Sequence, residues 1–211
     1  MARLTSAAWE WGRVLAADAS ASAPAGPGDG DREWVLRAQG GDTAAFRVLV
    51  DRYRHQALEV ALRIVRSPEA AEEAAQDAFV LAWKALGGFR HEARFSTWLY
   101  RIVTRCALDA VRRTRNRDRQ ETGLDLETLA AVPDPAPAPE GERRLRLERI
   151  LGELDPVPRA VVTLFYLRDL SVDEIAGALD LPQGTVKTHL HRSRAALRAA
   201  WRRHEATDGL R

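Results

Sequence analysis

Residues 181–194 combine cationic, hydroxyl and imidazole side chains in one short stretch, LPQGTVKTHLHRSR. The stretch opens at a leucine and a proline, contains three cations and two histidines, and has no acidic residue. Such side chains donate hydrogen bonds to phosphate oxygens and to the acceptor edges of bases. The stretch is therefore either a basic helix that faces solvent or a helix that enters a groove of DNA.

A second basic stretch lies upstream, between residues 90 and 119. It has nine arginines against three acids, a local charge of +6. Four arginines are spaced seven, four and seven residues apart, which places them on one face of a helix: Arg94, Arg101, Arg105 and Arg112. Acids are not interleaved with them as on an ordinary solvated helix, so we favour contact with nucleic acid over a solvated basic face.

Apolar periodicity predicts the helices that position this basic face. The opposite side of the arginine helix follows an i, i+3, i+4, i+7 template, formed by Phe95, Trp98, Leu99, Ile102, Val103, Cys106, Ala107, Ala110 and Val111. Two earlier helices are expected to begin at Asp42-Thr43 and at Ser67-Pro68-Glu69, where capping residues precede apolar repeats, and Gly87-Gly88 is expected to end the second. Because no run alternates apolar and polar residues, the block is predicted to be all-α.

A helix-turn-helix is predicted near the C-terminus. Ser171 and Glu174 have capping-box spacing at the start of a short helix, residues 180–182 make the turn, and a second helix runs over about 182–203. The residues expected to anchor the second helix are Val186, Leu190, Ala195 or Ser193, and Leu197. Those expected on its exposed face, near the end that contacts bases, are Thr185, Lys187, Thr188, His191 and Arg192, with Arg194 continuing the charge.

Two stretches of biased composition divide the chain. Residues 17–30 are mostly Ala, Ser, Pro, Gly and Asp, which indicates a disordered N-terminal extension over 1–30. Residues 132–141 contain four prolines at alternate positions, which favours a flexible, extended linker over 116–141. The predicted fold is all-α, with two small helical domains at 31–115 and 142–205 and a tail at 206–211.

Composition excludes several classes of protein. One cysteine, Cys106, rules out an internal disulfide framework, and no apolar run approaches the roughly 18–20 residues of a membrane-spanning helix. With no signal peptide recognised, we expect a cytoplasmic protein. His189 and His191 point to different sides of a helix, and the sequence has no metal-ligand cluster, phosphate-binding glycine loop or nucleophile elbow. We expect no cofactor, no metal and no enzymatic activity.

Three segments resemble the extracytoplasmic-function (ECF) sigma factors of bacterial RNA polymerase, in the sigma-70 family. They are AEEAAQDAFVLAWKAL (71–86), GFRHEARFSTWLYRIVTRCALDAVRR (88–113) and LSVDEIAGALDLPQGTVKTHLHRSRAAL (170–197). The resemblance extends over about 31–203 apart from the linker, and it includes the order and spacing of the segments. It implies an initiation factor whose first domain docks on core polymerase and opens the −10 element, while the second reads the −35 element.

The resemblance also implies roles for particular residues. The positions similar to the core-polymerase-binding segment are Gln76, Asp77, Phe79 and Trp83. Those similar to the −10-reading region, whose loop captures a flipped base, are Phe89, Arg90, His91, Arg94, Trp98, Arg101, Arg105 and Arg112. Those similar to the −35 reader are Thr185, Lys187, Thr188, His191, Arg192 and Arg194. Arg105 stands where many family members have Asn, so base choice at −10 is expected to differ, and Trp98 is expected to pack in the core.

The partners that the resemblance implies are core RNA polymerase, contacted at the coiled coil of its largest subunit and at its flap, promoter DNA and an inhibitory anti-sigma factor. The main alternative is a conventional helix-turn-helix regulator whose N-terminal helices serve signalling or dimerisation. A helical adaptor that reads no DNA is a second alternative. The arginine-striped helix argues against the first, and the basic face at 185–194 argues against the second.

Overall fold

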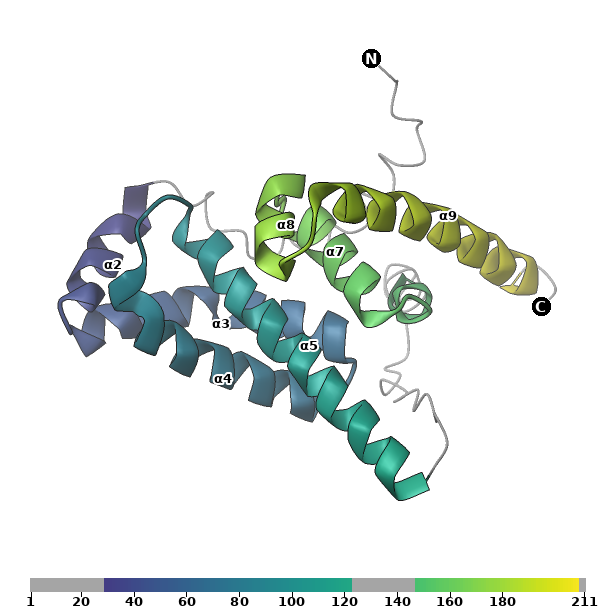
Figure 1. The fold of residues 1–211 in the computed structure, drawn as a ribbon, viewed down its shortest axis with the longest axis horizontal. Coiled ribbons are helices and arrows are strands. Elements are labelled where there is room, and N and C mark those ends of the chain that lie inside the picture. The colour runs from purple at the N-terminus through teal and green to yellow at the C-terminus, as the bar shows by residue number, and fades with distance from the viewer. Residues whose placement is uncertain (1–28, 123–146, 209–211) are drawn as a thin grey trace, which may run out of the picture.

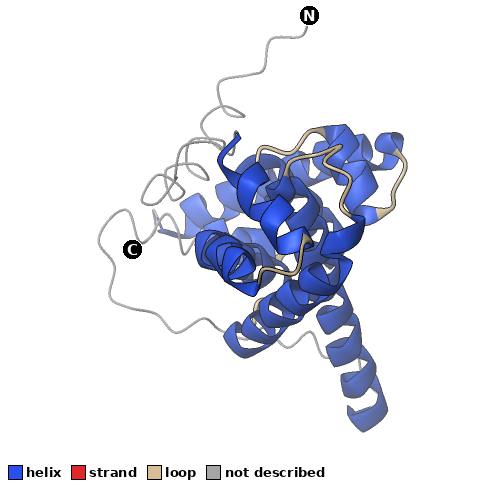
Figure 2. Cartoon of the chain, turned by 90° about the vertical axis from the view of Figure 1, so that its left-hand side faces the viewer, coloured by secondary structure: helices blue, strands red, loops and turns tan. Residues whose placement is uncertain are grey.

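A computed structural model of the chain describes residues 29–122 and 147–208, and every regular element in these two ranges is helical (Figures 1 and 2). The N-terminal block contains η2 (Asp29–Asp31), α2 (Arg32–Gln39), α3 (Thr43–Val65), α4 (Pro68–Ala85), η3 (Leu86–Gly88) and α5 (Phe95–Thr122). The C-terminal block contains helical residues 147–152, then α7 (Pro156–Leu167), α8 (Val172–Leu179) and α9 (Gln183–Asp208).

The helix starts predicted from the sequence are confirmed by their capping geometry. The Asp42 carboxylate accepts the backbone N–H of Ala45 at 3.0 Å, and the Ser67 hydroxyl accepts that of Ala70 at 3.3 Å. Pro68 occupies the first turn of α4, where its missing N–H costs no hydrogen bond. Each cap stabilises its helix by about 1 kcal/mol.

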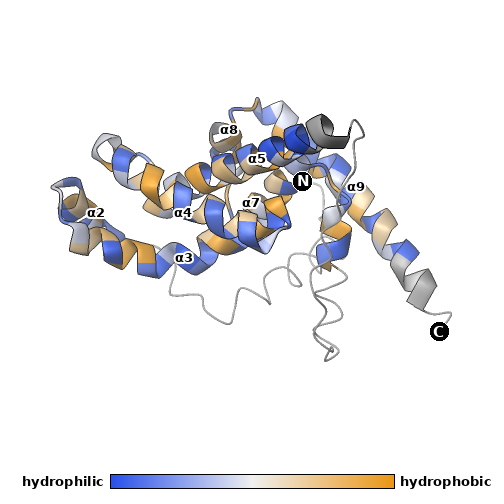
Figure 3. Cartoon of the chain, turned by 90° about the horizontal axis from the view of Figure 1, so that it is seen from below, coloured by the Kyte–Doolittle hydropathy of each residue, from blue (hydrophilic) through white to orange (hydrophobic). Residues whose placement is uncertain are grey.

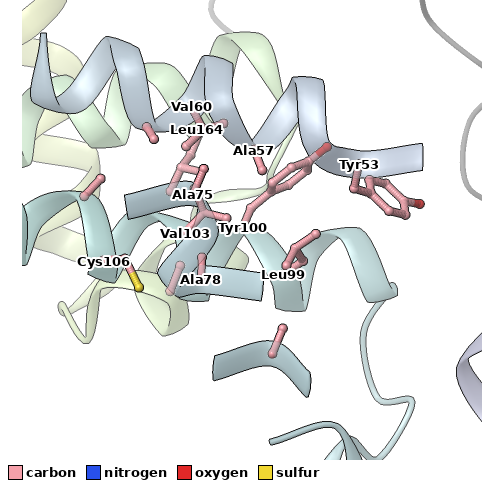
Figure 4. Packing of buried hydrophobic residues seen from close by; sticks show 14 of the residues in the cluster. Tyr53, Ala57, Val60, Ala75, Ala78, Leu99, Tyr100, Val103, Cys106 and Leu164 are labelled. Atoms are coloured by element: carbon pink, nitrogen blue, oxygen red, sulfur yellow. The ribbon is translucent and has the colours of Figure 1, made fainter. Parts of the chain in front are cut away.

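The core of the N-terminal block is the three-helix packing of α3, α4 and α5. Figure 4 shows side chains of these helices meeting, with Leu164 of α7 reaching the same cluster. Alanines on α4, such as Ala75 and Ala78, are buried and let the helices approach closely. Cys106 is buried on α5 as the apolar periodicity predicted, and Trp98, half-buried, packs against the same core.

The C-terminal block has a smaller core of its own. Its buried residues are Leu147, Ile150, Leu151, Leu154, Val162, Leu167, Leu197 and Ala200. They lie on residues 147–154, α7 and α9, so the long α9 holds the helical segment before α7 in place. Figure 3 shows apolar and polar residues interspersed along α7 and α9, the pattern expected where one stripe of a helix faces a core.

The two blocks are packed directly against each other. α7 lies on α3 and α8 lies on α5, and the larger core continues from Leu99 and Val103 into Leu164, Ile175 and Ala178 (Figure 1). Much of the polar contact between the blocks is made by arginines. Arg168 donates to the Gln56 carbonyl at 3.1 Å, and Arg159 donates to the Ile64 carbonyl at 3.1 Å.

The sequence predicts a linker from residue 116 and an N-terminal extension up to residue 30, and the described ranges cover only part of each. α5 continues to Thr122, so helix occupies the first residues of the stretch where a linker was predicted to begin at 116. The remainder of that predicted linker, and residues 1–28 of the predicted N-terminal extension, lie outside the described residues.

Candidate nucleic-acid interface

The loop at residues 89–94 joins η3 to α5 and rests on aromatic rings. We call the following set the aromatic cluster: Tyr53, Phe89, His91, Phe95 and Trp98. Neighbouring ring centroids in it are 4.8–6.2 Å apart, a range typical of favourable ring packing. Phe89 is buried and Trp98 half-buried, so both support the loop, whereas Arg90 and Arg94 are exposed.

The four aligned arginines of the sequence pattern differ in their surroundings. Arg94 and Arg112 are exposed, and Arg112 forms an ion pair with Asp109 at 3.0 Å on the helix surface. Arg101 and Arg105, between them, face the C-terminal block. Arg105 donates from Nε to the Ala178 carbonyl at 3.3 Å, and a methyl group on Gly177 would lie 3.3 Å from the nearest guanidinium nitrogen of Arg101. α8 therefore contacts the middle of the basic face, where Arg101 is half-buried and Arg105 remains exposed.

A side-chain hydrogen bond adds to this contact between α5 and α8. The Thr97 hydroxyl donates to the Glu174 carboxylate at 3.1 Å. Partial burial opposes ionisation of Glu174, but hydrogen bonds from Ser171 and Thr97, together with the charge of Arg101, lower its pKa below the usual value. Glu174 is therefore a carboxylate at neutral pH and an acceptor at the interface between the blocks.

The helix-turn-helix is formed by α8, a turn and α9. The predicted capping box is confirmed, because the Ser171 hydroxyl accepts the Glu174 N–H while the Glu174 carboxylate accepts the Ser171 N–H. Asp180 closes α8 in the left-handed conformation, at φ 56°. Val186, Leu190 and Leu197 are buried as predicted, and of the two alternatives for the remaining anchor, Ser193 is buried and Ala195 is exposed.

The outward face at the start of α9 carries most of the predicted DNA-contacting residues. Lys187, Thr188, His191 and Arg192 are exposed, and Thr185 is half-exposed. Arg194 differs from them, because its Nε donates to the Tyr166 hydroxyl at 2.7 Å and its guanidinium lies 5.7 Å from the Phe165 ring centroid. Arg194 thus joins α9 to α7.

The predicted polymerase-binding residues divide between surface and core of α4. Gln76 and Asp77 are exposed, whereas Phe79 and Trp83 are half-buried, and the Trp83 ring packs on Phe46 with centroids 5.0 Å apart.

Two apolar residues beside them were missed by the sequence reasoning. Val80 and Leu81 are 53% and 47% exposed. The signal was available, because six successive apolar residues at 78–83 exceed what one face of a helix can bury.

Neither a candidate metal centre nor a membrane-spanning helix is present among the described residues. The described residues contain no group of three or more His, Cys, Asp or Glu side chains that could hold a metal ion. In the same ranges, no helix is both long and apolar enough to cross a bilayer. Burial, and secondarily the charges of Asp77 and Asp109, raise the pKa of the Cys106 thiol, which makes it a poor nucleophile at neutral pH.

Comparisons with known proteins match both halves of the chain. Residues 49–117 match the family described as sigma-70 region 2, and residues 144–197 match the family described as sigma-70, region 4. The RNA polymerase sigma-H factor of Pseudomonas aeruginosa is 34% identical over 79% of this chain and 91% of its own length. The ECF RNA polymerase sigma factor SigW of Bacillus subtilis is 32% identical over 78% and 92%.

A solved structure is similar over most of the chain. It is that of CnrH in complex with the cytosolic domain of CnrY, with a TM-score of 0.59 and 29% identity over 81% of this chain and 96% of CnrH. The order of the two helical blocks along the chain, and the helix-turn-helix in the second, are thus shared with proteins of one family.

Proposed function

The chain belongs to the extracytoplasmic-function sigma factors of the sigma-70 family, and we propose that it binds core RNA polymerase and directs initiation at promoters whose −35 and −10 elements it reads. The observation that carries the proposal is the pairing of a region 2 block with a region 4 block, each with a basic face on one helix. Members of this family are initiation factors, and we assign the chain no reaction of its own.

The −35 element is read by the start of α9. Lys187, Thr188, His191 and Arg192 are exposed on one side of α9, next to the turn that follows α8. An α-helix fits the major groove of DNA, and arginine can donate two hydrogen bonds to one guanine edge. Arg192 is assigned to base recognition, and the more distant Arg198 to phosphate contact. Arg194 is assigned to holding α9 on α7, because its Nε donates to the Tyr166 hydroxyl.

The −10 element is read by the 89–94 loop and the arginine face of α5. The loop carries Arg90 and Arg94 next to His91 and the other rings of the aromatic cluster, which suits capture of a base that has left the stack. Arg101, Arg105 and Arg112 continue along the helix and would hold the backbone of the same strand.

This assignment requires the two blocks to separate. Arg101 is half-buried against α8, and Arg105, although exposed, donates to the Ala178 carbonyl, so both guanidinium groups become fully available to a DNA strand only after α8 has moved away from α5. The contact between the blocks combines apolar side chains, among them Leu164, Ile175 and Ala178, with arginine-to-carbonyl hydrogen bonds. Contacts of this mixed character between domains of one chain are commonly separable. We call the arrangement with α7 on α3 and α8 on α5 the closed arrangement. We propose that the chain adopts it when it is not bound to polymerase.

Core polymerase binds the exposed face of α4. Gln76 and Asp77 supply polar groups, and Val80 and Leu81 supply apolar surface that nothing covers among the described residues. An apolar patch beside polar residues is typical of a surface that binds another protein. We propose that this face receives the helical coiled coil of the largest subunit, and that the C-terminal block contacts the flap.

An anti-sigma factor is proposed as the inhibitory partner, in keeping with the family. CnrH was solved in complex with the cytosolic domain of another protein, CnrY, and a partner of this kind would cover the α4 face or keep the blocks closed. Operation in the cytoplasm, where polymerase is found, is part of the same proposal, as are domain limits at 31–115 and 142–205.

The function is tested by transcription in vitro with core polymerase on a pooled genomic template, with and without the chain. Discrete new starts that share upstream elements at −35 and −10 are the expected result. A variant with Lys187→Ala and Arg192→Ala is the control, since it should retain polymerase binding and lose −35-dependent starts. No polymerase-dependent starts, together with tight duplex binding by the chain alone, would instead identify a conventional DNA-binding regulator.

A further inference from the structure

Gln39, the last residue of α2, is hydrogen-bonded to the 89–94 loop and to its root in η3. Its side-chain Nε2 donates to the Leu86 carbonyl at 3.0 Å and to the Phe89 carbonyl at 2.8 Å. Its Oε1 lies 3.1 Å from Nε2 of His91. One half-buried amide therefore contacts the loop at its root, at its first residue and at a central side chain, across about 50 residues of sequence.

These three contacts set the tautomer of the His91 ring. A primary amide has two N–H donors, and both point at carbonyl oxygens, which can only accept. The oxygen of the Gln39 amide therefore faces His91, and it can accept only from a protonated ring nitrogen. Nε2 of His91 must carry a proton, which leaves Nδ1 as the ring's acceptor whenever the ring is neutral.

The loop itself has little regular backbone structure to hold it. Residues 89–94 belong to neither η3 nor α5, and the Phe89 N–H bonds back to Leu86 at 3.0 Å where the loop begins. His91 adopts a left-handed backbone conformation, with φ 59°, which is costly for a residue with a side chain unless its surroundings impose it. Gln39 on one side and the aromatic cluster, with Phe89 4.8 Å from the His91 ring, on the other supply that constraint.

The helix that carries Gln39 is itself fixed to α3. Asp31, next to its N-terminus, is buried, and its carboxylate accepts hydrogen bonds from the Arg52 guanidinium and from the Tyr53 hydroxyl. Burial, and then the hydrogen bond to Asp31, raise the pKa of Tyr53, so its hydroxyl remains a donor at neutral pH. Val35 and Ala38 add buried apolar contacts. The amide of Gln39 is thus held by a rigid element.

From this geometry we infer that Gln39 is a positioning residue for recognition of the −10 element: it sets the course of the 89–94 loop and the orientation and tautomer of His91, and through them the choice of base. The inference rests on the proposed function, because that function assigns the loop to the −10 element. Gln39 acts through the loop and does not itself contact DNA.

Two substitutions separate the hydrogen bonds of Gln39 from its bulk. Gln39→Met keeps a side chain of similar length and removes every hydrogen bond, while Gln39→Glu keeps the shape and removes both donors. Arg32→Met is the control, since it places the same new side chain on the same helix at an exposed position. Loss of the Arg32 charge can weaken DNA binding in general, but it leaves the loop contacts untouched.

The readout is base preference in the full chain bound to core polymerase. Initiation is measured on a promoter library with a randomised −10 element and a fixed −35 element, and in parallel on the reverse library. Both Gln39 variants should flatten the preference at the loop-read −10 position by about tenfold, which corresponds to about 1.4 kcal/mol. They should keep the −35 preference, and Arg32→Met should keep both.

The outcomes distinguish this inference from the proposed function. If the unmodified chain gives no starts, the proposed function fails. If the unmodified chain is selective and the Gln39 variants initiate with the same −10 preference, the positioning role is refuted. If the variants fold poorly, the inference is tested instead by nitrogen NMR of the unmodified chain labelled at histidine, which reports the ring nitrogen of His91 that carries the proton. It should show His91 protonated at Nε2, and a proton at Nδ1 alone would contradict the inference.

Discussion

Replacing Arg168 with methionine should open the closed arrangement and release Arg101 and Arg105 of the −10-reading face from α8. Arg168 follows α7, and its side chain is 7% exposed. It donates to the Gln56 carbonyl at 3.1 Å and to the Glu59 carboxylate of α3, and it lies 5.4 Å from the centroid of the Tyr100 ring on α5. All three contacts cross from the C-terminal block to the N-terminal block.

The size of the effect follows from what methionine retains. It keeps the length and apolar bulk of the side chain and removes the charge-assisted hydrogen bonds, which contribute about 1.5–3 kcal/mol each before the cost of burying the guanidinium is subtracted. Glu59 keeps Arg63 as a partner at 3.3 Å, so no carboxylate is left buried alone. A net loss of about 2 kcal/mol raises the ratio of open to closed chain by about 30-fold.

The assay is binding of a fluorescent single-stranded oligonucleotide, with the −10 sequence found by start-site mapping, to the full chain without polymerase. We expect Arg168→Met to bind more tightly, by up to about 30-fold when the closed form dominates. Arg149→Met, at an exposed position in the same block, removes the same charge and should bind slightly more weakly than the unmodified chain. If Arg168→Met behaves as Arg149→Met does, while scattering shows that its blocks have separated, the contact of α8 with α5 does not limit DNA binding.

Three further predictions concern other surfaces. Arg192→Ala should reduce discrimination between consensus and scrambled −35 duplexes by about 1–3 kcal/mol, whereas Arg198→Ala should weaken binding to both alike; equal losses on both duplexes for Arg192→Ala would remove it from base recognition. Leu81→Asp should lower affinity for core polymerase at least about tenfold. Its melting temperature should not change, because the Leu81 side chain is 47% exposed. Co-elution with core polymerase at the unmodified affinity would contradict the α4 assignment. The pKa of Glu174 is lowered on folding, so its stabilising contribution is complete above the unfolded value near 4.5 and is lost as pH falls below it. As the pH is lowered, the urea midpoint of Glu174→Gln should therefore fall less steeply than that of the unmodified chain. Equal slopes for the two proteins would exclude Glu174 as a source of the acid sensitivity.

The features predicted correctly from the sequence are those decided within a few residues. Asp42, Ser67 and Ser171 all cap helices as expected, because a cap depends on its own side chain and on backbone groups three positions away. Apolar periodicity likewise located the buried stripe of α5, including Cys106, since a stripe of that width has to face a core.

The features that escaped prediction depend on residues far apart in the chain. Arg101 and Arg105 belong to a regular basic face in the sequence, and the contacts that both make with α8 depend on residues far along the chain, since Ala178 is 73 positions beyond Arg105. Arg194 continues a basic run on α9, but its Nε donates to the hydroxyl of Tyr166 on another helix. Gln39 is one polar residue in a short helix, and no local pattern indicates that its partners lie about 50 residues ahead.

Several hydrogen bonds between the two blocks join an arginine side chain, as donor, to a peptide carbonyl, as acceptor. The acceptors are the carbonyls of Gln56, Ile64, Gly152 and Ala178. The donors are the side chains of Arg168, Arg159, Arg66 and Arg105. Every amino acid brings the same carbonyl, so these hydrogen bonds do not depend on the acceptor's side chain, whereas lysine does not reproduce the planar fork of arginine. The acceptor positions are limited by space instead, because Ile64 and Ala178 are buried and a Cβ on Gly152 would clash with the guanidinium of Arg66. Saturation mutagenesis should therefore find that even lysine fails at these arginines, whereas the acceptor positions accept any side chain that fits the space, and covariation between partner positions will be a poor guide to how the blocks meet.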